Sequence, residues 1–100
     1  MMDLNGFRAS LAGASPPPGL SLALQTLWWD AKGDWHLAHG CAQRDEGQTG
    51  SMVHAYLHRK QGDMSNASGW YRRAGRPVSE VPLEAEWESL ARELLSGEKP

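Results

Sequence analysis

Residues 54–75 read HAYLHRKQGDMSNASGWYRRAG and contain the pattern that decides the fold. The pair Gly62-Asp63 separates two segments whose apolar residues have helical spacing. Glycine readily adopts the left-handed conformation that ends a helix, and an aspartate carboxylate accepts from the free amide groups that open the next one. The stretch therefore predicts two helices joined by a tight turn, the first ending near Gln61 and the second near Ala74.

The same signals recur along the rest of the chain and predict only helices. They fall at about residues 20–32, 34–43, 51–61, 63–74 and 82–97, with a short helix near 4–11 and a polar connection over 44–50. The last of these helices is predicted to keep its glutamates on or near the solvent side, while Met64 and Trp70 are expected to point inward. No segment has the alternating pattern of a strand, so the predicted fold class is all-α.

Two of the predicted helical hairpins repeat one another at an interval of 29 residues. The matched residues are Gly33 and Gly62, Asp34 and Asp63, Ala38 and Ala67, Gly40 and Gly69, and Arg44 and Arg73. A small alanine lets paired helices approach closely. Glycine inside a helix costs about 1 kcal/mol relative to alanine, so close packing is the expected compensation at Gly40 and Gly69.

This pattern resembles the tetratricopeptide repeat, whose consensus also has Gly-Asp at the turn and a small alanine four positions later. Tyr71 and Ala74 match the aromatic residue and the alanine that follow in that consensus. The first unit departs from it, because Ala42 stands where the aromatic belongs, and the repeat is shorter than the usual period of about 34 residues. The resemblance covers roughly residues 20–77 and implies two antiparallel helical hairpins with the last helix as a cap.

The block from His54 to Gly75 is also similar to a family of small uncharacterised microbial proteins, with the segments HAYLHR, GD, NA and WYRRAG in common. This second resemblance implies the same fold and a bacterial protein, and it implies no mechanism. We divide the chain into a flexible lead-in over residues 1–18, where Pro16-Pro17-Pro18 favours extended structure, and a single helical-repeat domain over residues 19–97.

Composition narrows the classes of partner and the compartment. The net charge of −2 provides no field that would attract nucleic acid or an anionic membrane. The single Cys41 excludes an internal disulfide and favours a reducing compartment. No signal-peptide pattern or membrane-length apolar segment is present. We therefore expect a cytoplasmic protein with no membrane or nucleic-acid partner. The basic residues between Arg59 and Arg76 leave an anion contact open as an alternative.

Six residues of the opening stretch form the predicted binding site. They combine hydrogen-bond donors, one cation and flat aromatic surface, the composition that interfaces favour. They are His54, His58, Arg59, Asn66, Trp70 and Tyr71. A competing interpretation makes His54 and His58 partly buried structural residues that hydrogen-bond to neighbours such as Asn66 or Tyr71.

The histidine spacing raises a further alternative. His54 and His58 are four apart and share a helix face, an arrangement that can bind a divalent metal, and His36, His39 and Cys41 could add ligands. No glutamate follows His54, however, and the spacing fits no zinc class that we can name. The prediction is therefore no metal and no cofactor.

Enzyme signatures are missing, because the sequence has neither a nucleophile elbow nor a phosphate-binding glycine loop. The preferred function is a small non-enzymatic helical-repeat protein that binds another protein or a peptide. Helical repeats need neighbours to complete their cores, so a homodimer is also predicted. The alternative is a small-molecule or metal site around His54 and His58, with catalysis left open.

Overall fold

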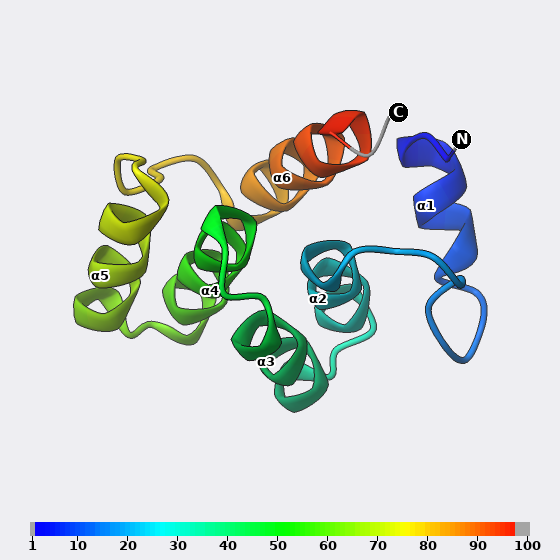
Figure 1. Cartoon of the computed structure of the whole chain (residues 1–100), viewed down its shortest axis with the longest axis horizontal. Coiled ribbons are helices and arrows are strands. Elements are labelled where there is room, and N and C mark those ends of the chain that lie inside the picture. The colour runs from blue at the N-terminus through cyan, green and yellow to red at the C-terminus, as the bar shows by residue number, and fades with distance from the viewer. Residues whose placement is uncertain (1, 98–100) are drawn as a thin grey trace.

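The computed structural model describes residues 2–97 and confirms the all-α class, since these residues form six helices and no strand. The helices are α1 (Leu4–Ser10), α2 (Leu22–Ala31), α3 (Trp35–Arg44), α4 (Gln48–Gln61), α5 (Met64–Ala74) and α6 (Leu83–Gly97) (Figure 1). Within this part of the chain, no helix combines the length and the apolar character needed to cross a membrane.

Helix α4 is the centre of the molecule. It contacts α2, α3, α5 and α6, and Figure 1 shows it surrounded by its neighbours. All nine residues from Gly50 to His58 are buried, polar ones included. A helix buried on every side cannot turn its polar side chains to water, so each of them needs a partner inside the protein.

The same turn joins α2 to α3 and α4 to α5, as the repeat predicts. Gly33 and Gly62 have φ values of 84° and 88°, in the left-handed region that glycine tolerates. Asp34 and Asp63 each accept, through Oδ1, from the backbone amide three residues later, at 3.0 Å in α3 and 3.2 Å in α5. The alanines four positions on, Ala38 and Ala67, are both fully buried.

The expected close packing at the two mid-helix glycines is wrong. A Cβ atom placed on Gly40 or Gly69 would meet no atom within 4 Å outside its own helix turn. The close approach lies instead at Gly50, where a Cβ would be 1.9 Å from the carbonyl oxygen of Asp45. Gly50 was predicted to lie in a loop, but α4 begins earlier, at Gln48.

These glycines give a stability prediction with opposite signs. Gly40→Ala and Gly69→Ala should each raise the free energy of unfolding by roughly 0.5–1 kcal/mol, because alanine loses less backbone entropy in a helix. Gly50→Ala should lower it by about 1–3 kcal/mol through overpacking. Urea unfolding of the three variants measures both effects, and a destabilised Gly40→Ala would contradict the open space seen around it.

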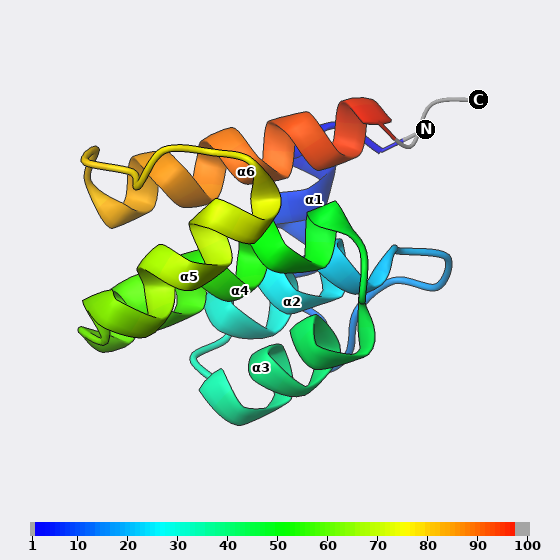
Figure 2. The same ribbon diagram turned by 60° about the vertical axis from the view of Figure 1, so that its left-hand side comes forward.

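Helix α6 lies across α2 and α4 and reaches α1 (Figure 2). Trp87 on α6 donates its indole N–H to the carbonyl oxygen of Leu27 at 3.0 Å. Its ring stacks on Phe7, with centroids 5.8 Å apart, and Phe7 is fully buried. The predicted lead-in thus contains a helix whose side chains join the main core.

One inward residue was predicted wrongly. Met64 is 44% exposed because it is the first residue of α5 and directly follows the exposed residues 61–63 of the turn. Trp70, in the middle of the same helix, is half-buried against α4.

Candidate functional site

Three histidines lie close together where α3 packs against α4. His39 on α3 and His54 on α4 face each other through their Nε2 atoms, which are 3.0 Å apart. His58, one turn after His54, has its Nδ1 atom 3.2 Å from the Oε1 atom of Gln61. One ring nitrogen from each histidine lies within 4.8 Å of the other two. His54 and His58 are buried, whereas His39 is half-buried at the edge of the cluster.

Two tryptophans hold the rings of this cluster. Trp35 stacks on His39 with a centroid distance of 4.6 Å and an interplanar angle of 11°. Trp70 stacks on His54 at 3.8 Å and 13°. The guanidinium of Arg73 lies over the Trp70 ring, 4.6 Å from its centroid. The imidazoles are therefore fixed by ring contacts as well as by hydrogen bonds.

The surroundings keep His39 and His54 neutral. Burial, followed by the positive charges that His39, His58 and Arg73 can carry, lowers the pKa of His54 to about 4. Burial, followed by the nearby His58 and His36, also lowers the pKa of His39. At neutral pH the two rings share one hydrogen bond, with one Nε2 donating and the other accepting.

This lowered pKa predicts a loss of stability in mild acid. Unfolded histidine has a pKa near 6.5. Between about pH 6.5 and pH 4, His54 is therefore protonated in the unfolded chain but not in the folded protein. The contribution of His54 to the free energy of unfolding reaches up to about 3 kcal/mol. It is complete above pH 6.5 and is lost as the pH falls towards 4. Urea unfolding across this range in EDTA measures it.

Two variants distinguish the effect of His54 from that of the other titrating groups. His54→Phe should flatten the pH dependence. His36→Gln alters an exposed histidine of the same region and should keep most of the wild-type slope, because His36 is the last of the three causes that lower the pKa of His39. If stability falls with pH equally steeply in His54→Phe and in the wild-type protein, His54 does not cause the loss of stability in acid.

The six residues of the predicted binding site do not form one exposed surface. The ring of His54 stacks on Trp70 on α5 and on His58 one turn along α4. Asn66 is exposed in the first turn of α5. The histidines hydrogen-bond to His39 and Gln61, and not to Asn66 or Tyr71 as the structural interpretation expected.

Arg59 and Tyr71 meet elsewhere, at Glu86 of α6. Arg59 donates from Nη1 to Oε1 of Glu86 at 2.7 Å, and the Tyr71 hydroxyl donates to Oε2 at 2.5 Å. Arg59 also donates to the carbonyl oxygen of Val81. Glu86, predicted to face solvent, is only 6% exposed. That prediction is wrong because Arg59 supplies the charge that lets a carboxylate be buried.

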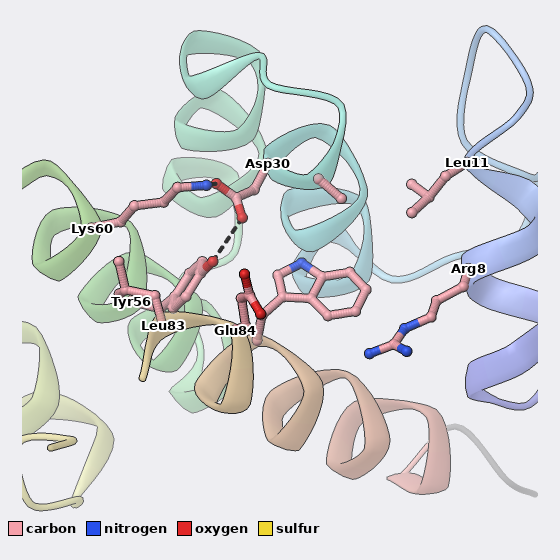
Figure 3. Close-up of a pocket in the computed structure, with 9 residues that line it drawn as sticks. Arg8, Leu11, Asp30, Tyr56, Lys60, Leu83 and Glu84 are labelled. Carbon is pink, nitrogen blue, oxygen red and sulfur yellow. Dashed lines mark hydrogen bonds and ion pairs between the residues drawn. The ribbon is translucent and has the colours of Figure 1, made fainter. Parts of the chain in front are cut away.

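A second buried carboxylate, Asp30 of α2, escaped the sequence interpretation. Its Oδ2 atom accepts from the Tyr56 hydroxyl at 2.9 Å, and its Oδ1 atom accepts from Lys60 Nζ at 2.9 Å (Figure 3). Asp30 stands three positions after Leu27 and seven after Ala23, on the buried face of α2. That spacing was the signal that could have placed it inside.

A pocket of about 570 Å³ opens next to Asp30, where α1, α2, α4 and α6 converge. It is lined by Arg8, Leu11, Asp30, Ala31, Tyr56, Lys60, Leu83, Glu84 and Trp87. In Figure 3, Tyr56 and Lys60 point towards Asp30, while Arg8 extends from α1 on the far side. The pocket thus combines an apolar floor with charged groups from four helices.

Comparison with known proteins adds no identification. No protein-family model matches the chain. No curated protein and no solved structure matches it either. The geometry of the histidine cluster and of the pocket therefore has to support any functional conclusion.

Proposed function

We propose that this chain is a small non-enzymatic binding protein that takes a short peptide segment of a partner protein into the pocket between α1, α2, α4 and α6. The pocket is the observation that carries this proposal. Its volume of about 570 Å³ lies within the range of roughly 300–1,000 Å³ typical of ligand sites. Leu11, Leu83 and Trp87 give it apolar surface.

The charges around the pocket favour a basic ligand. Asp30 is already bound by Tyr56 and Lys60, and Arg8 is 3.5 Å from the carboxylate of Glu88. Glu84 is exposed and has no ion-pair partner within residues 2–97. A peptide with an apolar side chain next to a lysine or arginine would bury the first on Trp87 and pair the second with Glu84.

The repeat supports the same class of function. The two Gly-Asp turns have matching backbone geometry, which favours the proposed relation to tetratricopeptide hairpins, with α6 as the cap. Stacked helical hairpins commonly offer extended surfaces to partners. As part of this proposal we place the protein in the bacterial cytoplasm, where a lone cysteine such as Cys41 stays reduced.

The experiment is selection of a phage-displayed library of random short peptides on the purified chain, followed by titration of the enriched peptides. Two variants alter the pocket at exposed positions: Ala31→Arg fills it, and Glu84→Lys reverses its free charge. Glu80→Lys is the matched control, because Glu80 is exposed close by and does not line the pocket.

Enriched peptides should carry an apolar residue beside a basic one. They should bind Ala31→Arg and Glu84→Lys at least about tenfold more weakly and Glu80→Lys with unchanged affinity. Failure to enrich any peptide, or equal binding to all variants, would overturn the proposal. Sedimentation velocity tests whether a second copy of this chain occupies the pocket instead. A dimer that dissociates in the Ala31→Arg variant would assign the pocket to that second copy.

A further inference from the structure

We propose that His39, His54 and His58 together bind one divalent transition-metal ion, zinc(II) in first place, at the seam between α3 and α4. This site is separate from the pocket of the preceding proposal and does not depend on it. It unites two histidines of one helix with a third from a neighbouring helix, and one ring nitrogen of each lies within 4.8 Å of the other two.

The spacing of the nitrogen atoms is close to what one ion needs. Zinc–nitrogen bonds of about 2.0–2.1 Å in a tetrahedral site place ligand nitrogens roughly 3.3 Å apart. The Nε2 atoms of His39 and His54 are 3.0 Å apart, and all three ligand nitrogens lie within 4.8 Å of one another. Separations of up to 4.8 Å must therefore shorten by up to about 1.5 Å for one ion to bind all three nitrogens.

The surroundings prepare the rings for this role. Trp35 and Trp70 stack on His39 and His54, which restricts the ring orientations before any ion arrives. Gln61 accepts from Nδ1 of His58 at 3.2 Å, and this hydrogen bond favours the neutral tautomer whose Nε2 lone pair can bind a metal. A hydrogen bond on the non-ligating nitrogen is the usual support of a metal-bound histidine.

Binding requires two local adjustments. The His39–His54 hydrogen bond must give way to two metal bonds, and the ring that donates through Nε2 must carry its proton on Nδ1 instead. The His58 ring must also turn, because its plane is within 16° of that of His54 and one ion has to lie near both ring planes. Rotation about the outer side-chain torsion of histidine is soft. His39 is half-buried, so the ion would enter on its side.

The ligand set selects the class of metal. Three imidazole nitrogens suit zinc, copper and nickel, whereas calcium and magnesium prefer oxygen ligands. Cys41 is two residues from His39 but does not belong to the group of converging ligands. Three protein ligands leave the fourth zinc position to water.

The test uses the full-length chain, stripped of metal with EDTA and then freed of the chelator. Zinc binding is measured by calorimetry, and cobalt(II) serves as a spectroscopic probe, since a tetrahedral cobalt site absorbs visible light. His39→Ala and His58→Ala each remove one ligand. His36→Ala is the matched control, because it removes an exposed histidine of the same helix as His39 that is not part of the cluster.

One zinc ion per chain is expected, with at least about a tenfold loss of affinity in each ligand variant and less than a twofold change in His36→Ala. Helical circular dichroism identifies a variant that fails to fold. His39→Ala, at the edge of the cluster, keeps the test valid if His58→Ala unfolds. The absence of saturable binding, or an equal loss in His36→Ala, would show a hydrogen-bonded histidine cluster only and overturn the proposal.

Discussion

Replacing Phe7 by alanine is expected to lower the free energy of unfolding by about 3–5 kcal/mol, the usual cost of removing a buried phenylalanine. Phe7 is fully buried, and its ring stacks on Trp87 of α6. The truncation would leave a cavity where α1 meets α6. Urea unfolding followed by tryptophan fluorescence measures the loss, because Trp87 lies at the altered contact.

Asn5→Ala is the matched control for this variant. Asn5 belongs to the same short helix but is exposed, so its replacement should change stability by less than about 0.5 kcal/mol. The comparison also tests the predicted lead-in. If Phe7→Ala cost less than about 1 kcal/mol, residues 2–18 would be dispensable for the stability of the domain, as a flexible segment requires.

Glu86→Ala should be as damaging, at about 3–5 kcal/mol, because it leaves a partly buried guanidinium without its carboxylate. The side chain of Arg59 is only 15% exposed where it meets Glu86. The Tyr71 hydroxyl would lose its acceptor too. Burial, together with its hydrogen bond to Glu86, raises the pKa of Tyr71 above its ordinary value, so this hydroxyl remains a donor at neutral pH.

A double-mutant cycle with Tyr71→Phe separates the two bonds to Glu86. The coupling between these residues should exceed about 0.5 kcal/mol, since they share one hydrogen-bond network. Glu84→Ala, an exposed glutamate one half-turn earlier on α6, should cost less than about 1 kcal/mol. Equal losses for Glu84→Ala and Glu86→Ala would show that burial of the Glu86 carboxylate does not matter.

The elements were predictable because their signals are local. In each Gly-Asp turn, two adjacent residues indicate where one helix ends and where the next one is capped. The start of α4 was predicted too late, because local signals alone make Gly50 look like a loop residue. Only the nearby Asp45 carbonyl explains why glycine is needed at this position inside a helix.

The candidate sites were less predictable because their partners come from distant parts of the chain. Arg59 and Glu86 are 27 residues apart, and Asp30 and Lys60 are 30 apart, so no spacing along the sequence indicates either pair. His39 did have a signal. It lies with Trp35, Ala38 and Ala42 on the face of α3 that packs inward, whereas His36 lies outside that face.

The burial of α4 on every side also determines which backbone amides exchange last with heavy water. Amides of an exposed helix exchange through local fraying, whereas those buried on all sides exchange only when the surrounding elements separate. For residues 51–58, each neighbouring helix blocks one route of local opening. Their exchange rates therefore report the global unfolding equilibrium of the whole domain, and a ligand bound at any of its faces would slow the same eight amides.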